Sequence, residues 1–243
     1  MNIKSQIPNL LTLANLLCGT LIIISSFQLN FVNVAFFAIA ALLFDFLDGT
    51  AARLLNVTSA IGKELDSMAD MVSFGVAPAL VLYNYWGNEF FNGMGNGSFF
   101  SLVYLNDLII YTPLLIAVFS GYRLAKFNTS NQSNDFFTGL PTPALALACF
   151  ALPLAAEQFE LANIWLTHPV FIILFCAGGS ALLISNLKLF SLKIGSKNKQ
   201  LNMVRVAMLL VCILLIIWLN FFGAFLCLFV FILFSLSVQK IIA

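Results

Sequence analysis

Apolar runs follow one another along almost the whole chain, and they restrict its fold more than any other feature. About 20 apolar residues in an α-helix cross the hydrocarbon core of a bilayer. Hydrophobic residues make up 61% of the 243 residues and charged residues only 9%, whereas soluble domains are about a quarter charged. In lipid the backbone must satisfy its own hydrogen bonds. We therefore predict an all-α, polytopic membrane helix bundle.

Polar, glycine-rich and lysine-rich segments divide the apolar runs into eight predicted spans. The clearest breaks are residues 87–107, 127–138 and 187–202. The predicted spans are residues 9–29, 31–54, 65–86, 108–126, 139–158, 167–186, 203–221 and 223–241. We treat residues 1–243 as one integral membrane domain.

The basic residues determine the predicted orientation, because all eleven fall on one side of the eight spans. They are Lys4, Arg53, Lys63, Arg123, Lys126, Lys188, Lys193, Lys197, Lys199, Arg205 and Lys240. The other side carries Glu89, Asp107, Glu157 and Glu160 and no base. The positive-inside rule makes the basic side cytoplasmic, with both termini inside. A six-span alternative would break this segregation, and the net charge of +1 gives no indication of a nucleic-acid partner.

Four aspartates lie at the predicted cytoplasmic ends of the second and third spans. Asp45 and Asp48 are three residues apart, and Asp66 and Asp70 are four apart, so each pair shares one helical face. Carboxylates gathered at the membrane boundary repel one another and are costly to bury unless a cation lies between them. Oxygen ligands without His or Cys favour Mg²⁺, Mn²⁺ or Ca²⁺.

The residues between the two pairs indicate a diphosphate site. Gly49 and Ala52 leave the same helix end nearly free of side chain, so a ligand can approach the backbone closely. Arg53 offers a planar fork for phosphate oxygens. Two other interpretations of such acids are a solvated helix cap and the ion site of a transporter.

These positions read Asp45-x2-Asp48-Gly49-x2-Ala52-Arg53-x8-Gly62-x3-Asp66-x3-Asp70, which resembles, without departure, the signature of the CDP-alcohol phosphatidyltransferases. The resemblance implies attack of a hydroxyl on a CDP-linked donor with release of CMP. It implies that Asp45, Asp48 and Asp66 hold two divalent metal ions, and that Asp70 holds one of them and is the general base. Residues 1–158 would then be the catalytic region and residues 159–243 additional transmembrane helices.

The same resemblance implies contacts with CDP-diacylglycerol. Gly49, Arg53 and Ser59 would contact the nucleotide diphosphate, and the Pro8-Asn9-Leu10-Leu11 stretch would line the cytidine pocket. The candidate donor-binding residues are Pro8, Asn9, Gly49, Ala52, Arg53, Ser59 and Gly62.

Three further segments resemble the phosphatidylserine synthase branch of that family: residues 67–79 (SMADMVSFGVAPA), 122–128 (YRLAKFN) and 139–144 (GLPTPA). The branch implies L-serine as acceptor and eight spans. Arg123 or Lys126 would receive the serine carboxylate or the donor phosphate, although basic residues at a cytoplasmic helix end also satisfy the positive-inside rule alone. Further candidates for the serine ammonium or hydroxyl are Asn128 and Ser73.

Two alternatives remain open at this point. The acceptor could be glycerol 3-phosphate or an inositol phosphate, with the same chemistry. In a different class, a cation-coupled transporter would have acids near the middle of the membrane and an internal repeat, and the sequence shows neither. We expect a homodimer in a bacterial or archaeal cytoplasmic membrane, with the site facing the cytoplasm.

Overall fold

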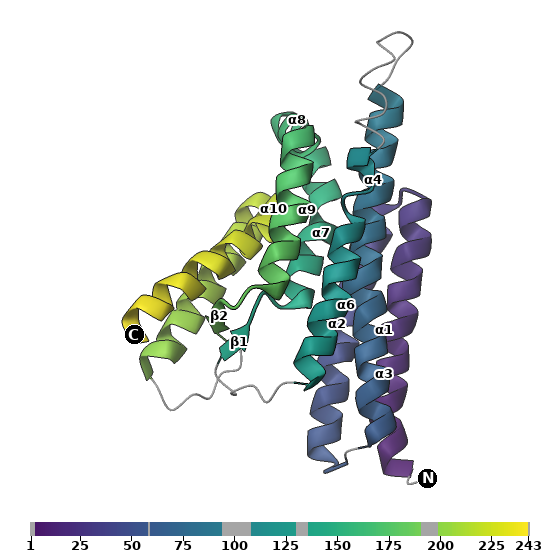
Figure 1. Ribbon diagram of the computed structural model, residues 1–243, viewed down its shortest axis with the longest axis vertical. Helices are drawn as coiled ribbons and strands as arrows, with labels where there is room; N and C mark the ends of the chain where they lie inside the picture. Colours follow the sequence, from purple (N-terminus) through teal and green to yellow (C-terminus); the bar gives the residue numbers. More distant parts are fainter. Residues whose placement is uncertain (1–2, 58, 94–107, 130–135, 191–198, 243) are drawn as a thin grey trace.

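The computed structural model describes residues 3–57, 59–93, 108–129, 136–190 and 199–242. Most of these residues are helical, and the helices form one elongated bundle (Figure 1). The elements are α1 (Ile3–Phe27), α2 (Phe31–Leu54), α3 (Ala60–Asp70), the π-helix η1 (Met71–Val76), α4 (Ala77–Gly93), α6 (Leu114–Thr129), β1 (Phe136–Thr138), α7 (Thr142–Gln158), α8 (Glu160–Leu166), α9 (Pro169–Ile184), β2 (Lys188–Phe190) and α10 (Lys199–Ile242).

The predicted polytopic helix bundle is confirmed. Within the described ranges, five helices are long and apolar enough to cross a membrane, or six if the pair α8 and α9, bent by 66°, counts as one span. Each predicted span overlaps a helical segment. The count of eight and the orientation of the termini stay predictions.

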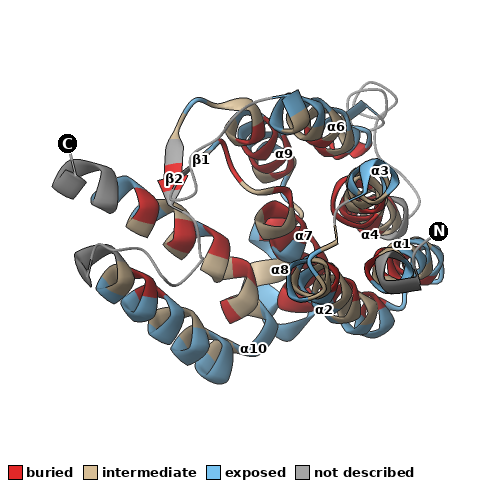
Figure 2. Cartoon of the chain, turned by 90° about the horizontal axis from the view of Figure 1, so that it is seen from below, coloured by how far each residue is buried: buried red, intermediate tan, exposed pale blue. Residues whose placement is uncertain are grey.

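The last two predicted spans fall on the two arms of α10. The helix breaks at Asn220, which has non-helical backbone angles (φ 47°, ψ −121°). The arms run back along each other as a hairpin (Figures 1 and 2), and Cys227 Sγ lies 3.8 Å from the carbonyl oxygen of Cys212.

The helix α7 lies at the centre of the bundle (Figure 2) and contacts α2, α4, α8 and α10. Its side chains between Leu145 and Ala156 are buried on almost every side, with Leu147 exposed. A helix that is apolar all round packs in the interior. Its first turn, beginning at Thr142, is therefore held in place by the helices around it.

The π-helix η1 joins α3 to α4 and packs closely between α1 and α6. A Cβ atom on Gly19 of α1 would collide with Ser73, and one on Gly75 would lie 3.2 Å from the Cβ of Ser120 on α6. Small residues permit such close helix approach in membranes. The packing fixes Asp70, the last residue of α3, between α1 and α6.

A short antiparallel pair, β1 with β2, lies near the lower ends of α7 and α9, opposite α8 (Figure 1). Phe136 pairs with Phe190, and the backbone N–H of Gly139 continues the contact by donating to the carbonyl of Leu187 at 2.9 Å. Residues 127–138 were predicted only as a polar link. Strands of three residues are too short to show an alternating sequence pattern, so pairing across distant segments was not predictable.

The backbone of Gly139 supports a stability prediction. Gly139 has φ +80°, and a Cβ there would collide with the carbonyl oxygen of Leu183. We expect Gly139→Ala to destabilise the protein by about 1–3 kcal/mol. The matched control is Gly178→Ala in α9, where an added Cβ meets no atom within 4 Å. Thermal unfolding in detergent measures both variants, and equal melting temperatures would contradict the assigned strain.

Candidate active site

Three aspartates from two helices converge beside the α2–α3 turn. Asp45 and Asp48 come from the last turns of α2, and Asp66 from α3. One carboxylate oxygen from each lies within 4.8 Å of the other two. Asp48 is buried, and Asp45 and Asp66 are half-buried. The turn between α2 and α3 is short, so the two helix ends must lie side by side, and their acidic faces meet.

A fourth carboxylate joins this cluster from the end of α3. The charge of Asp70 interacts with those of Asp45, Asp48 and Asp66, and also with the guanidinium of Arg123 on α6. The Asp70 Oδ1 atom is buried and has no hydrogen-bond partner among the described residues. Four acidic groups therefore share one region, where the guanidinium of Arg123 acts on Asp70.

This arrangement fits divalent cations. Four carboxylates facing one arginine leave excess negative charge in a partly buried place, which is unfavourable without a further cation. The donor atoms of the cluster are all carboxylate oxygens, and the unpartnered Oδ1 of Asp70 adds a free oxygen to the set. Hard cations such as Mg²⁺, Mn²⁺ and Ca²⁺ prefer such ligands, whereas zinc favours His and Cys.

Thr12 orients one member of the cluster and was missed from the sequence. Its Oγ1 lies 2.7 Å from Oδ2 of Asp48 and 3.0 Å from the carbonyl oxygen of Pro8, and the contact with Asp48 is buried. A hydroxyl that donates to a carboxylate restricts its rotation and connects α1 to α2. The only sequence signal was the four-residue spacing from Pro8, which places Thr12 on the same face of α1.

The end of α2, which carries the candidate donor-binding residues Gly49, Ala52 and Arg53, is accessible from outside the bundle. A Cβ on Gly49 would meet no atom within 4 Å, and Ala52 is half-buried. The exposed Arg53 folds back along its own helix, where its Nε donates to the Gly49 carbonyl at 2.9 Å. The structure thus brings the predicted glycine and arginine together at an accessible surface.

The remaining donor candidates meet where α1 reaches α3. Ser59 is the N-cap of α3, and its Oγ accepts a hydrogen bond from the Gly62 N–H at 2.9 Å. A Cβ on Gly62 would lie 3.0 Å from Oδ1 of Asn9, so glycine allows α1 to approach closely. Pro8, the residue before Asn9 in α1, is buried. Ser59 and Gly62 therefore have a structural role in addition to the predicted contact.

Two basic acceptor candidates lie on α6. Arg123 donates from Nη1 to Thr142 Oγ1 at 3.3 Å, and its Nε is buried without a hydrogen-bond partner among the described residues. Lys126 Nζ lies 3.4 Å from Oδ1 of Asn186. Arg123 is the one of the two that faces the acidic cluster, since its charge acts on Asp70.

The other two acceptor candidates differ in their surroundings. Asn128 donates from Nδ2 to the Oγ of Ser67 at 2.8 Å. Ser67 is the residue directly after Asp66 in the chain. Ser73 is fully buried and donates to the backbone carbonyl of Asn15 at 3.0 Å. Asn128 therefore lies beside the cluster, and the Ser73 hydroxyl is engaged in the packing of η1 on α1.

The family described as CDP-alcohol phosphatidyltransferase matches residues 5–175. The chain is 37% identical over 142 residues to the CDP-diacylglycerol–serine O-phosphatidyltransferase of Helicobacter pylori strain J99, covering 58% of this chain and 54% of that protein. It is 30% identical over 184 residues to the protein of the same name from Bacillus subtilis, and the alignment covers 76% of this chain and 89% of that protein. The protein of the same name from Methanocaldococcus jannaschii is 32% identical over 183 residues, and the alignment covers 75% of this chain and 72% of that protein. The alignment with the Helicobacter protein spans about half of that relative's length.

The Thr12 contact supports a prediction about metal affinity. We expect Thr12→Val to weaken Mn²⁺ binding about tenfold, because the Asp48 carboxylate loses the hydrogen bond that orients it. Thr12→Ser keeps the hydroxyl and is the matched control. Titration of each purified variant with Mn²⁺, monitored by electron paramagnetic resonance, measures both affinities. Wild-type affinity in Thr12→Val would contradict the orienting role.

The acidic cluster also supports a prediction about metal removal. In metal-free protein we expect Asp45→Asn to raise the melting temperature, because one repelling charge is removed. Mn²⁺ at about a hundred times its Kd should stabilise the wild type by about 2.7 kcal/mol. The variant should gain clearly less, and the control Glu89→Gln on α4 should behave like the wild type. Equal stabilisation of wild type and Asp45→Asn would contradict a metal site at Asp45.

Proposed function

Since this chain belongs to the CDP-alcohol phosphatidyltransferase family, we propose that it transfers the phosphatidyl group of CDP-diacylglycerol to L-serine, giving phosphatidylserine and CMP. The observation that carries the proposal is the convergence of four aspartates with Arg123 at one end of the bundle. The names of the relatives from three organisms support both the donor and the acceptor.

The metal content is part of the proposal. We assign two divalent ions, Mg²⁺ or Mn²⁺ with Ca²⁺ compatible, to Asp45, Asp48 and Asp66, with Asp70 also holding one of them. When bound there, divalent cations would neutralise the donor diphosphate and stabilise the negative charge that develops on CMP. Thr12 keeps the Asp48 carboxylate oriented for this purpose.

Asp70 is assigned as the general base. A hydroxyl near neutral pH is a poor nucleophile, so a positioned carboxylate must take its proton as attack begins. The Asp70 carboxylate has two oxygens, so one can hold an ion while the other accepts that proton; its buried Oδ1 has no hydrogen-bond partner among the described residues. The serine oxygen then forms a bond to the phosphorus of the phosphatidyl group, the bond from that phosphorus to the CMP oxygen breaks, and CMP leaves with the electron pair.

The donor is assigned to the open end of α2. Its diphosphate would lie over Gly49 and Ala52, where no side chain blocks approach to the helix. Arg53 would exchange its hydrogen bond with the Gly49 carbonyl for phosphate oxygens and stabilise the developing charge. The nucleotide would contact the α1–α3 junction, formed by Pro8, Asn9, Ser59 and Gly62.

The acceptor is assigned to the space between Asp70 and Arg123. Serine carries its hydroxyl and its carboxylate on neighbouring carbons, so one molecule can present the first to Asp70 and the second to Arg123. The primary hydroxyl of glycerol 3-phosphate is one carbon further from the carbon that bears its phosphate, and we assign serine as the acceptor on the names of the relatives. We also assign Lys126 and Asn128 to contacts with the carboxylate or the ammonium; Asn128 lies beside the cluster through its hydrogen bond to Ser67. Ser73 would contribute through packing of η1 against α1.

The position of the site agrees with a lipid donor that stays in the bilayer while its headgroup reacts at the surface. We place the protein in the cytoplasmic membrane with this end of the bundle facing the cytoplasm, following the positive-inside rule. A homodimer is also part of the proposal.

Release of CMP from CDP-diacylglycerol tests the function. Purified protein with Mg²⁺ or Mn²⁺ is supplied with L-serine, glycerol 3-phosphate or an inositol phosphate. We expect CMP release that depends on serine. Release only with another acceptor would overturn the serine assignment and keep the chemistry. Cation-driven transport into vesicles without any CMP release would overturn both.

The base assignment gives a separate prediction. Asp70→Asn removes the proton acceptor and should lower serine-dependent CMP release by at least about a hundredfold, the usual contribution of a general base. The melting temperature of the variant shows whether it is folded. Substantial turnover by folded Asp70→Asn would exclude Asp70 as the base.

A further inference from the structure

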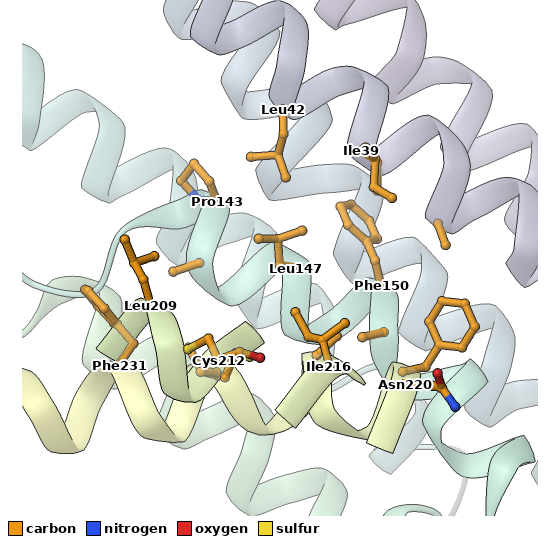
Figure 3. Close-up of a pocket in the computed structure, with 18 of the residues that line it drawn as sticks. Ile39, Leu42, Pro143, Leu147, Phe150, Leu209, Cys212, Ile216, Asn220 and Phe231 are labelled. Atoms are coloured by element: carbon orange, nitrogen blue, oxygen red, sulfur yellow. The ribbon is translucent and has the colours of Figure 1, made fainter. Parts of the chain in front are cut away.

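Asn15, near the middle of α1, is fully buried, and neither polar atom of its side chain has a hydrogen-bond partner among the described residues. A buried amide without partners is unfavourable and rare in folded proteins. Asn220 differs, because its exposed amide lies at one end of the apolar groove between α2, α7 and α10 (Figure 3). Asn15 does not line that groove, and the helices around α1 enclose it.

The side chain of Asn15 lies on the face of α1 that contacts the candidate active site. Thr12 lies three residues before it and Gly19 four residues after it, so the three share one helical face. Thr12 contacts the buried carboxylate of Asp48, and a Cβ on Gly19 would collide with Ser73 of η1. Asn15 therefore lies between a contact with α2 and a contact with η1.

The register of α1 against α2 places Asn15 level with Asp45. The two helices are consecutive, joined by a short turn, and run in opposite directions (Figure 1). Thr12 of α1 pairs with Asp48 of α2. Three residues further along α1 correspond to three residues back along α2, because both helices rise about 1.5 Å per residue. The residue of α2 at this level is Asp45.

The register of α1 against α3 places the same side chain beside Asp70. The two helices run in the same direction, and η1 continues α3 (Figure 1). Gly19 contacts Ser73, and four residues before these two are Asn15 and Ala69. The close approach at the α1–α3 junction described above gives the same register within one residue. Asp70 is the next residue of α3, and its Oδ1 is also buried without a hydrogen-bond partner among the described residues.

A cation is the group that satisfies both of these oxygens. The Oδ1 atoms of Asn15 and of ionised Asp70 are acceptors, so they cannot satisfy each other. An amide that stabilised a carboxylate would donate to it from Nδ2, but the Nδ2 of Asn15 donates to no described residue. Asparagine carbonyl oxygens are ordinary ligands of hard divalent cations. An amide also adds an oxygen without adding a fifth negative charge to carboxylates that already repel one another.

We propose that Oδ1 of Asn15 is a ligand of the divalent ion assigned to Asp70, so that α1 supplies a neutral oxygen to a metal centre otherwise built from α2 and α3. The inference deepens the metal assignment of the proposed function and rests on it. It gives α1 two separate roles, since Thr12 orients the Asp48 carboxylate and Asn15 binds the ion itself. It also accounts for an amide buried at the level of Asp45 and Asp70.

Two substitutions at position 15 separate a metal ligand from a hydrogen-bond donor. Asn15→Leu has nearly the same size and no polar atom. Asn15→Asp keeps an oxygen at the same place and loses the N–H donor. The matched control is Asn84→Leu, because Asn84 is a half-buried amide near the opposite end of α1, where it donates to Ser26 Oγ at 2.8 Å.

Mn²⁺ binding to the purified full-length protein, measured by electron paramagnetic resonance without substrate, is the main test. We expect Asn15→Leu to weaken the binding of one Mn²⁺ ion at least about tenfold, since even loss of an outer-shell partner costs that much. Asn15→Asp should bind Mn²⁺ at least as tightly as the wild type, and Asn84→Leu should match the wild type. Wild-type affinity in Asn15→Leu would overturn the proposal. Equal weakening in Asn15→Leu and Asn15→Asp would identify the N–H donor as the functional group and overturn it too.

Thermal unfolding of metal-free protein tests for a purely structural role. Asn15→Leu replaces an unsatisfied amide by an apolar side chain, so we expect its melting temperature to equal or exceed that of the wild type. Asn84→Leu loses a hydrogen bond and should melt lower. A lower melting temperature in Asn15→Leu, as in Asn84→Leu, would assign the amide to packing and overturn the proposal.

Serine-dependent CMP release separates this inference from the proposed function. Weaker Mn²⁺ binding by Asn15→Leu, in a protein whose wild type releases no CMP, would support the ligand and reject the proposed function. Serine-dependent release by the wild type, with unchanged Mn²⁺ affinity in Asn15→Leu, would keep the function and overturn the ligand. An effect of Asn15→Leu confined to KM for serine would also overturn the ligand and assign Asn15 to the acceptor.

Discussion

Mutual repulsion among four partly buried carboxylates is the constraint on which the rest of this structure depends. Asp45 and Asp48 on α2 lie close to Asp66 on α3, Asp70 at the end of α3 interacts with all three, and the guanidinium of Arg123 acts on Asp70. Each neighbouring helix contributes to holding them there. The helix α1 donates a hydroxyl, α6 brings the arginine, and small residues let η1 pack between both. The result is a rigid oxygen-rich site whose remaining charge suits divalent cations.

Much of this site follows from spacing along the chain. Asp45 and Asp48 share a helical face, as do Asp66 and Asp70, and a short turn between apolar spans requires the two faces to meet. The hydrogen bond of Thr12 to Asp48 and the electrostatic interaction of Arg123 with Asp70 join residues of different helices that are far apart in sequence. Local pattern carries no information about such pairings. The π-helix and the strand pair were missed for a related reason, since both depend on packing between distant segments.

The chain combines a region that matches the family with a segment that lies outside the match. The acidic cluster, the open end of α2 and the α1–α3 junction lie within residues 5–175, which match the family. The α10 hairpin lies beyond that match and packs against α7. Because α7 also carries Thr142 beside Arg123, the peripheral hairpin and the charged site share one buried helix.

The β1–β2 pair ties the start of α7 to the segment that leads into α10. In sequence β1 precedes α7 and β2 follows α9, so their pairing closes this part of the chain into a loop, and α10 packs against β2. A transmembrane hairpin tilts when the thickness of the surrounding bilayer changes. Because β2 cannot shift without moving β1, such a tilt would be transmitted to Thr142 and from there to Arg123. The small strand pair thus gives the site a mechanical link to the membrane in which it works.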